Sequence, residues 1–304
     1  MRHLALILIT VKLLIISANA TEPTKVIKIG TGSILEGYYN IGLTICEYIA
    51  QSSNCKCEVV PTNGSIENLS LLQNDKVDFA IIQSNIALST FDGSEQYTKV
   101  NRSLRQVLNL YDEIFTIVAK DDDKIKVFAD IAGKRISNGN PSSASTLTFD
   151  ELKKYYSFAK PIDIELSQED YAKQLCEGNI DAIILVTGHP NALVSLIANH
   201  CNVDFVAIEQ KKMQSILAGN KAYGKAKLLK NLYPGISIDQ DTISMQAILI
   251  TTDKIDPKIV ENLVIYFAQN KQRFMQSHQI LKGIDDDRFF NNFVLPSFLV
   301  TNSK

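Results

Sequence analysis

The sequence predicts an α/β protein made of two similar lobes. Continuous apolar, β-branched strands alternate with helix-like stretches, a pattern typical of parallel sheets covered by helices. The order of elements also repeats, because NDKVDFAIIQS and EGNIDAIILVTGH each contain a polar turn, a β-branched residue, an aspartate (Asp78 or Asp181) and an apolar strand. With 304 residues, 45% of them hydrophobic and 21% charged, the chain is long enough for two such lobes.

The first half contains three expected strands and two expected helices. The strand VIKIG (26–30) leads into a loop of Gly and Ser residues and then into the helix-like stretch IGLTICEYIA. A second strand, CEVVP, is followed by a turn and by a helix that we expect from about Ser65. A tight turn then precedes a strand over Val77–Ile82.

The second half follows a similar order. GKRISNGNPSSASTLTFDELKKYY predicts a strand, a loop of small residues and a helix, and QEDYAKQLCEGNIDAIILVTGHP predicts a helix, a tight turn, a strand and a loop. The echo is weak as a sequence repeat and stronger as an order of elements.

Two segments are expected to cross between the lobes. Residues 111–133 begin as a strand and enter a charged turn, and residues 244–256 form an apolar strand that ends at Asp256-Pro257, a good helix start. The amphipathic stretch 257–275 then predicts a helix that returns to the first lobe. The expected organisation is a signal peptide over 1–20, the first part of lobe I over 21–118, lobe II over 119–243, and the return to lobe I with C-terminal helices over 244–304.

The N-terminal stretch MRHLALILITVKLLIISANA has the features of a secretory signal peptide cleaved near Ala20. The alternative is an uncleaved anchor, but Lys12 interrupts an apolar run that is short for a membrane span. We therefore expect a periplasmic protein without stable membrane insertion. Loss of Arg2 and Lys12 changes the formal charge from −2 to −4, and no Lys/Arg run follows, so the sequence predicts no nucleic-acid partner.

Five cysteines follow the expected cleavage site, in an early and a late group. Export makes disulfides plausible, and we expect one bridge in each group, with one cysteine unpaired or joined to another chain. Cys55-Lys-Cys57 lacks the second Cys or His pair of a zinc site. The sequence predicts no metal and no cofactor.

Five loops are expected at the carboxyl ends of the strands, where open α/β folds bind ligands: 30–39, 61–66, 83–85, 138–146 and 187–191. Such loops are mostly turns and caps, but five at corresponding positions favour a binding site. Helix N-termini among them offer unpaired N–H groups to an anion. They share hydroxyl, amide and small side chains, with no Lys or Arg among the candidates: Thr31, Ser33, Tyr38, Tyr39, Asn63, Gly64, Ser65, Gln83, Ser84, Asn140, Ser143, Ser145 and His189.

Catalytic motifs are not found, and we expect a protein that is not an enzyme. The glycines after the first strand are spaced GxGxxxxG and not GxGxxG, and neither a Walker A lysine nor a GxSxG elbow is present. Ser157 and Lys160 match SxxK without the SDN or KTG motifs that accompany it. No two histidines have metal-ligand spacing.

Four motifs in order, GTGSILEGYYNIG, TNGSIENL with DFAIIQSN, GKRISNGNPSSAS and IDAIILVTGHPNALV, resemble the substrate-binding proteins of TAXI-type TRAP transporters over roughly residues 25–300. The resemblance implies a two-lobed periplasmic-binding-protein fold (type II-like) with a ligand cleft between the lobes. It also implies a function: capture of a small carboxylate such as glutamate or 2-oxoglutarate and its delivery to a sodium-coupled membrane permease. Alternatives with the same fold are a receptor for an ABC importer and a sensory receptor.

The same resemblance assigns the candidate residues to ligand loops and adds Pro190 beside His189 in the far loop of lobe II. It also implies two disulfides, Cys46–Cys57 and Cys176–Cys201. Some positions depart from the family pattern, among them Asn63 in place of a glycine, Asn85 in place of an acid, and a Ser142–Ala144 core in place of Gly-Ser-Gly. These departures leave the identity of the ligand open.

Overall fold

The computed structural model describes residues 25–34, 37–94, 100–122, 124–139, 143–282 and 284–301. Its strands join in one ten-stranded sheet with the order β2-β1-β3-β10-β4-β7-β5-β6, while β8 also pairs with β4 and β9 with β10. The strands are β1 (Val26–Gly30), β2 (Lys56–Val60), β3 (Phe79–Gln83), β4 (Leu104–Lys120), β5 (Arg135–Ser137), β6 (Ile162–Asp163), β7 (Ala182–Thr187), β8 (Val203–Phe205), β9 (Gly224–Leu228) and β10 (Gln240–Thr252).

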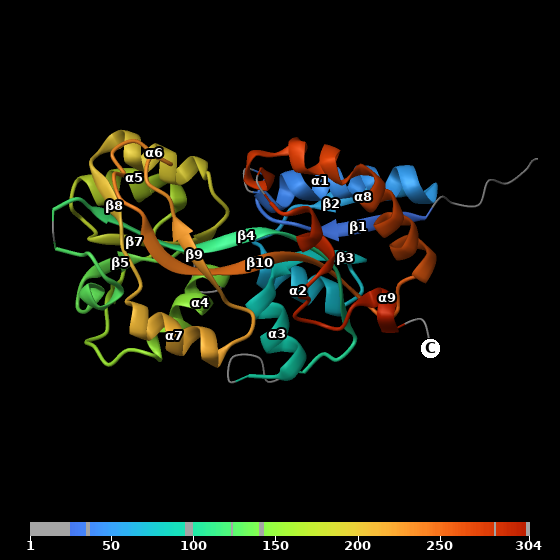
Figure 1. Ribbon diagram of the computed structural model, residues 1–304, viewed down its shortest axis with the longest axis horizontal. Helices are drawn as coiled ribbons and strands as arrows, with labels where there is room; N and C mark the ends of the chain where they lie inside the picture. The colour runs from blue at the N-terminus through green and yellow to red at the C-terminus, as the bar shows by residue number, and fades with distance from the viewer. Residues whose placement is uncertain are drawn as a thin grey trace, which may run out of the picture.

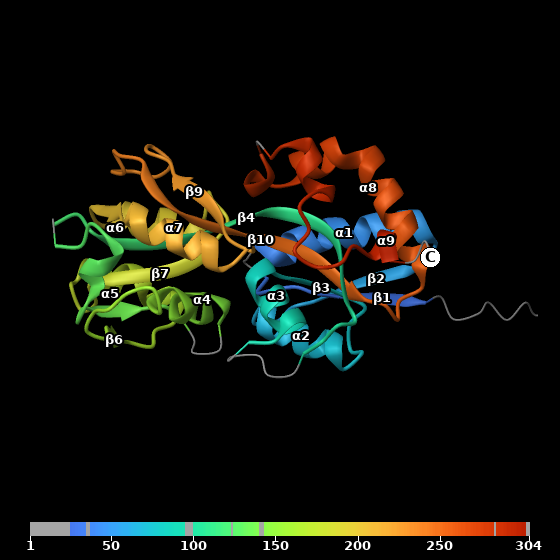
Figure 2. The same cartoon turned by 60° about the horizontal axis from the view of Figure 1, so that its bottom comes forward.

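Helices cover both faces of this sheet (Figures 1 and 2). The α-helices are α1 (Gly37–Ser53), α2 (Ser65–Gln73), α3 (Ser84–Asp92), α4 (Ala144–Lys153), α5 (Tyr171–Cys176), α6 (Ala192–His200), α7 (Gln210–Gly219), α8 (Pro257–Ser277) and α9 (Phe298–Thr301). Short 3-10 helices are η1 (Phe128–Ile131), η2 (Gln168–Asp170), η3 (Gln279–Leu281) and η4 (Asp286–Phe290).

The sheet divides into two parallel portions joined by two long strands. β2, β1 and β3 pair in parallel in one portion, and β7, β5 and β6 in the other. Between them, β10 runs antiparallel to β3 and β4, and β4 runs antiparallel to β7 (Figure 1). We call the half with β1, β2 and β3 lobe I and the half with β5, β6 and β7 lobe II. The two-lobed α/β fold is therefore confirmed, with the crossing strands adding the antiparallel pairs.

Each lobe has a buried core on both faces of its part of the sheet. In lobe I, α1 and α8 pack on one face around Tyr48 and Phe267, and α2 and α3 pack on the other around Leu72 (Figure 2). In lobe II, α4 and α7 cover one face and α5 and α6 the other, with Phe149 and Leu175 in the respective cores. Burial of apolar area in four such clusters is the main stabilising term of the fold.

The first crossing strand is longer than expected. We predicted a strand from residue 111, but β4 begins at Leu104. Its first part contains buried polar side chains that pair within the fold. Gln106 Nε2 donates to Asn109 Oδ1 at 2.6 Å, and Asn109 Nδ2 donates to the carbonyl of Arg288 at 2.9 Å. Because these two amides find partners in the C-terminal segment, their burial in the strand is compensated by hydrogen bonds, whereas the buried Nε of Arg105 in the same part of β4 has no partner among the described residues.

The helix predicted over 257–275 is α8, and its start is confirmed. The Asp256 carboxylate accepts from the backbone N–H of Lys258 at 3.0 Å, and Pro257 occupies the first turn. The helix packs against α1, where Tyr48 Oη donates to the carbonyl of Asn270 at 3.1 Å. The predicted lobe boundaries at 118/119 and 243/244 fall inside β4 and β10; they stay a prediction.

Both disulfides implied by the family resemblance are present. Cys46–Cys57 joins α1 to β2, and Cys176–Cys201 joins the end of α5 to the residue after α6. Cys55 is the free cysteine and is half-buried. The expected signal peptide lies outside the described residues. Within the described ranges, no helix has the length and apolar character needed to cross a bilayer.

Candidate ligand-binding site

The first predicted loop is held together by Thr31, whose side chain is fully buried. Its Oγ1 donates to the carbonyl of Val60 at 2.9 Å, and its own carbonyl accepts from Thr62 Oγ1 at 3.0 Å. Thr31 thus joins the loops that follow β1 and β2. Ser33 is exposed and Tyr39 is half-buried.

The second predicted loop introduces α2. Asn63 is exposed, and its backbone N–H and Nδ2 donate to Glu67 Oε2 at 2.9 and 2.8 Å, so the pair closes the first turn of the helix. Gly64 has φ +93° and ψ −151°, a conformation essentially confined to glycine, and a Cβ there would meet nothing within 4 Å. Asn63 in place of the family's usual glycine is therefore compatible with the loop, since the following glycine adopts the special conformation.

Ser65 lies at the centre of a buried hydrogen-bonded group near the junction between the two lobes. Its Oγ accepts from the backbone N–H of Gln83 at 3.0 Å and lies 3.4 Å from Tyr38 Oη. Tyr38 Oη in turn donates to Glu113 Oε2 at 2.7 Å. Burial, together with the negative Glu113, raises the pKa of Tyr38 well above its usual range, so Tyr38 remains a donor at physiological pH.

Glu113 was not predicted from the sequence. It lies on β4, where that strand leaves β10 and begins to pair with β7, and only 5% of it is exposed. The sequence contains a signal, because Glu113 stands near the start of the mainly apolar strand YDEIFTIVAK, where a carboxylate is costly to bury unless it has a partner.

Polar side chains of the two lobes meet beside the start of α3. Asn85 Nδ2 donates to Thr148 Oγ1 at 3.0 Å and to Tyr223 Oη at 3.4 Å, and Thr148 Oγ1 donates to Gln83 Oε1 at 3.4 Å. Ser84 Oγ donates to the carbonyl of Ala222 at 3.3 Å. We call Gln83, Asn85, Thr148 and Tyr223 the junction cluster. Gln83 and Ser84 are sequence candidates that this arrangement brings into contact with lobe II.

The junction cluster contains one buried acceptor without a partner. Asn85 Oδ1 has no hydrogen-bond donor within the described residues, although Asn85 is only 1% exposed. Tyr223 donates to Glu151 Oε2 at 2.6 Å, and burial with this carboxylate raises the pKa of Tyr223 well above its usual range. Thr148 and Tyr223 were missed because no pattern in the sequence marks one threonine in a helix or one tyrosine before a strand.

The serines of the lobe II loop cap and anchor α4. Ser143 is the N-cap, and its Oγ accepts from the backbone N–H of Thr146 at 3.1 Å. Ser145 Oγ accepts from the backbone N–H of Val186 at 3.0 Å, which joins α4 to the end of β7. Asn140, together with Ser142 and the first-loop residues 35 and 36, lies outside the described residues.

His189 follows β7 and is joined to two other elements. Its Nε2 lies 2.8 Å from Thr116 Oγ1 on β4, and its Nδ1 lies 2.5 Å from Tyr233 Oη in the loop between β9 and β10. Burial lowers the pKa of His189 to about 4, so the ring is neutral at physiological pH. Pro190 is exposed.

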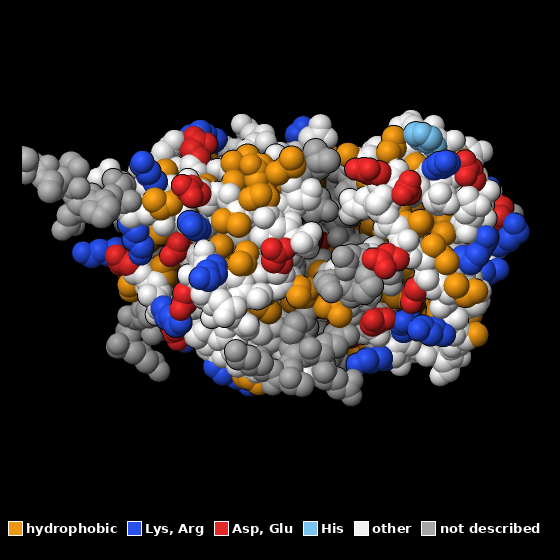
Figure 3. Space-filling model, turned by 180° about the vertical axis from the view of Figure 1, so that it is seen from behind, with side chains coloured by type: hydrophobic (Ala, Val, Ile, Leu, Met, Phe, Trp, Pro, Cys, Tyr) orange, Lys and Arg blue, Asp and Glu red, His pale blue; other side chains and the backbone are white. Residues whose placement is uncertain are grey.

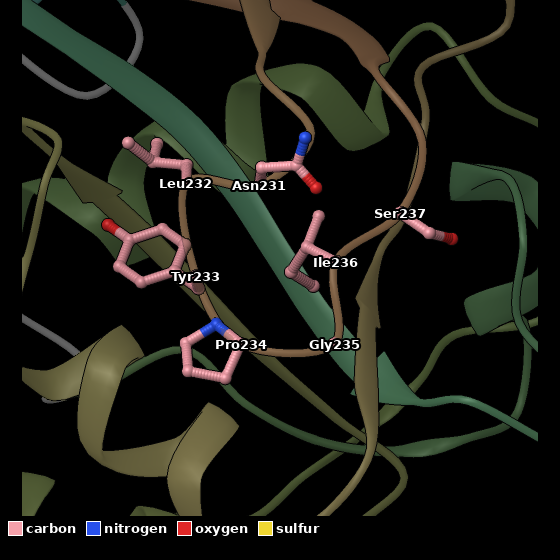
Figure 4. Close-up of a pocket in the computed structure, with 7 residues that line it drawn as sticks. All are labelled: Asn231, Leu232, Tyr233, Pro234, Gly235, Ile236 and Ser237. Carbon is pink, nitrogen blue, oxygen red and sulfur yellow. The ribbon is translucent and has the colours of Figure 1, made fainter.

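The described part of the chain has two surface pockets, and the first of them is lined in part by Tyr233, the partner of His189. One, of about 490 Å³, is lined by residues 231–237 (Figure 4), and the other, of about 290 Å³, lies between the end of α1 and α8. Neither is lined by a sequence candidate. On the face seen in Figure 3, basic and acidic side chains are interspersed, so this face has no broad patch of one charge.

The junction between the lobes contains neutral hydrogen-bond donors and acceptors from both lobes, together with the carboxylate of Glu113. Within the described ranges, no group of three or more His, Cys, Asp or Glu side chains is placed to hold a metal ion. The chemistry available here is reversible binding of a small polar molecule by hydrogen bonds, because buried donors and acceptors that face a ligand fix its orientation.

Solved structures similar to this chain share its architecture. One, described as the substrate-binding protein of an amino acid ABC transporter, has a TM-score of 0.50 and 15% identity and covers 88% of this chain and 99% of its own. A second, from work on glutathione import through GshT and the cystine ABC importer TcyBC of Streptococcus mutans, has a TM-score of 0.55 and 10% identity, with 88% and 100% covered. A third is an ancestral arginine-binding protein bound to glutamine, with a TM-score of 0.50, 15% identity, and 85% and 98% covered.

At these identities the likeness concerns the fold, which is the two-lobed fold of periplasmic binding proteins with a ligand cleft. A sequence model of the NMT1-like family matches residues 29–298, which is most of the chain. The match includes every described candidate residue of both lobes. The chain therefore belongs to the NMT1-like family.

Proposed function

We propose that this protein is an exported solute-binding receptor whose lobes close on a small polar molecule and present it to a membrane permease. The observation that carries the proposal is the junction cluster, in which Gln83 and Asn85 of lobe I bond to Thr148 of lobe II. The end of β3 and the start of α3 in lobe I thus face α4 of lobe II, and such contacts between lobes are what hinge closure around a ligand requires. The two crossing strands, β4 and β10, supply the hinge.

The ligand we favour is a small carboxylate that also carries a donor, such as glutamate. The exposed or half-buried candidate loops offer neutral N–H and hydroxyl donors to a carboxylate. The buried acid Glu113, beside Ser65 and Tyr38, favours a ligand with an ammonium group over a dicarboxylate without one. Glutamate meets both conditions, whereas 2-oxoglutarate meets only the first.

The partner we favour is the permease of an ABC importer. Support comes from the structures of similar fold: one is described as the substrate-binding protein of an amino acid ABC transporter, and another comes from work on glutathione import through GshT and the cystine ABC importer TcyBC. The second candidate is a TRAP permease, favoured by the resemblance of the four ordered motifs to TAXI-type receptors. The gene next to this one discriminates between them, because an ABC system needs an ATPase subunit and a TRAP system does not.

Thermal unfolding of the purified protein tests the proposal, after unfolding and refolding have removed any co-purified solute. The panel contains glutamate, glutamine, arginine, cystine, 2-oxoglutarate, C4-dicarboxylates and a neutral sugar. A receptor gains stability as RT ln(1 + [L]/Kd), so one solute at 100 times its Kd stabilises by about 2.7 kcal/mol. We expect that response with an amino acid and no turnover of it.

A pair of variants connects the response to the junction cluster. Thr148→Val keeps the shape of a fully buried side chain and removes its bonds to Gln83 and Asn85. Thr44→Val, at a half-buried position of α1, is the control with the same chemical change. We expect Thr148→Val to weaken the solute response at least about tenfold in Kd. An equal response in both variants would contradict the proposed site, and no response to any solute would contradict the receptor function.

A further inference from the structure

The imidazole of His189 connects three elements that are distant in sequence. Its loop follows β7, its Nε2 meets Thr116 on β4, and its Nδ1 meets Tyr233 between β9 and β10. Both ring nitrogens therefore have partners within the protein. Phe205 on β8 packs edge-on against the ring, with centroids 6.1 Å apart.

The positions of the protons in this series of hydrogen bonds follow from the other partners of Tyr233 and Thr116. The backbone N–H of Asn191 donates to Tyr233 Oη at 2.7 Å, so the single proton of Tyr233 is available for His189 Nδ1. At the other end, Thr116 Oγ1 donates to the carbonyl of Ile114 at 3.0 Å, so Thr116 can accept from His189 Nε2. All four hydrogen bonds can form together when Nδ1 accepts the Tyr233 proton and Nε2 carries the proton that it donates to Thr116.

We infer that Tyr233 is a positioning residue that holds His189 in the Nε2–H tautomer and thereby fastens the 187–191 loop to β4. The resulting sequence of bonds runs from Asn191 through Tyr233, His189 and Thr116 to Ile114. His189 then has no ring nitrogen left for a ligand, and its contribution is to hold the loop in place. The loop 231–237, which lines the pocket in Figure 4, becomes mechanically joined to the candidate site through Tyr233.

The neutral state of the ring agrees with this assignment. The described contacts of the ring are Thr116 from β4, Phe205 from β8 and Tyr233 from the β9–β10 loop, and Tyr233 is the one titratable group among these three. Its proton is committed to His189, and burial raises the pKa of Tyr233 itself. A second proton on the imidazole would face the Tyr233 hydroxyl donor to donor, so it is disfavoured.

Nitrogen-15 NMR of the purified protein tests the inference, with the ring resonances of His189 assigned by their loss in His189→Gln. We expect an Nε2-protonated ring in the wild type. In Tyr233→Phe the donor to Nδ1 is lost, and we expect a mixture of tautomers, while the ring stays neutral because its burial is retained. Tyr223→Phe, which removes a hydroxyl bonded to Glu151, is the control and should leave the His189 resonances unchanged.

A wild-type ring protonated on Nδ1 would overturn the inference, and so would an unchanged ring in Tyr233→Phe or an equal change in Tyr223→Phe. If Tyr233→Phe fails to fold, Thr116→Val replaces it. Tyr233 still donates to Nδ1 in that variant, so the tautomer should persist while the Nε2 resonance moves. A switch to Nδ1–H there would equally contradict the role of Tyr233.

Solute binding provides a second readout, and only this part depends on the proposed function. The amide of His189→Gln can accept from Tyr233 and donate to Thr116, so we expect the Kd for the solute found in the thermal panel to change by less than about tenfold. A larger loss in His189→Gln with a folded protein would indicate direct contact between the ring and the solute. The NMR outcome stands by itself even if no solute binds, so the two failures are distinguishable.

Discussion

At the residue scale, Asp78 and Asp181 perform the same task in the two lobes. Asp78 donates its backbone N–H to the carbonyl of Lys28 at 2.9 Å and accepts the backbone N–H of Lys28 on Oδ2 at 2.9 Å. Asp181 makes the same two bonds with Arg135, at 2.7 and 2.8 Å. Each aspartate thus begins one strand by closing a ring with the neighbouring parallel strand, which explains why both halves of the sequence place an aspartate there.

The lobe II aspartate also forms an ion pair, which leads to a pH prediction. Burial acts to raise the pKa of Asp181, but hydrogen bonds and charge attraction from Arg135 outweigh it, and the pKa is lowered in the folded protein. The unfolded carboxyl titrates near 3.9, so the stabilisation is complete above that pH and is lost as the pH falls through the lowered folded value.

We expect Asp181→Asn to lower the free energy of unfolding at pH 7 by about 1 kcal/mol, because the ion pair is partly exposed. Urea unfolding at pH 7 and at pH 3 checks this, since the gap between variant and wild type should narrow at the lower pH. Asp163→Asn, at an exposed position of β6, is the control. A gap that widens on acidification would contradict the direction of the pKa shift.

At the element scale, the second disulfide joins the ends of two helices that pack in the same hydrophobic core of lobe II. Cys176 ends α5 and Cys201 follows α6, and both helices pack on the same face of lobe II. The bridge closes a loop with a sequence separation of 25 residues. A cross-link of this span restricts the unfolded chain, which is one source of its stabilising effect.

We expect the double variant Cys176→Ser, Cys201→Ser to lose about 3 kcal/mol of unfolding free energy. Guanidinium unfolding in the absence of reductant measures it. Cys55→Ser, which removes the free thiol and no bridge, should remain within about 0.5 kcal/mol of the wild type. An undiminished stability of the double variant would show that packing of α5 and α6 alone sets the lobe II core.

At the scale of the whole molecule, the lobes touch on a second side through Gly188. A Cβ at this position would lie 2.9 Å from Tyr111 Cε2 and 3.5 Å from Ile280 Cγ2. Tyr111 belongs to the part of β4 that pairs with β10, and Ile280 packs against the lobe I core. The glycine therefore permits close approach of the lobe II loop to lobe I.

We expect Gly188→Ala to push the lobes apart, because the ring of Tyr111 has to move, and to weaken solute binding by about tenfold. Small-angle scattering of the protein without solute checks the first effect as a larger radius of gyration, and titration with the bound solute checks the second. Gly224→Ala on β9, whose Cβ would meet only Ser244 Oγ at 3.3 Å, is the control. Identical scattering from both variants would show that this contact does not govern the arrangement of the lobes.

Local patterns predicted several elements of each lobe, whereas α3, α6, α7, β8 and β9 had no counterpart among the expected elements. The helix from Ser65 begins at the expected residue, after the N-cap Gly64, and the helix after Asp256-Pro257 begins where its capping chemistry predicts. The strand expected over Val77–Ile82 begins two residues later, at Phe79, because Asp78 bonds to Lys28 before the ladder starts. Such signals lie within a few residues of the structure they specify, so a single sequence carries them.

The resemblance to a known family was sufficient for the disulfides and for the two-lobed fold, while the tertiary structure alone decided the contacts of the candidate residues. Asn85 and Thr148 are 63 positions apart and meet only when the lobes are placed against each other. His189 finds Thr116 and Tyr233 for the same reason, and Glu113 likewise finds Tyr38, which lies 75 positions before it. Hydrogen bonds act over about 3 Å, so they depend on the position of the whole chain, whereas periodicity and capping depend on neighbours along it.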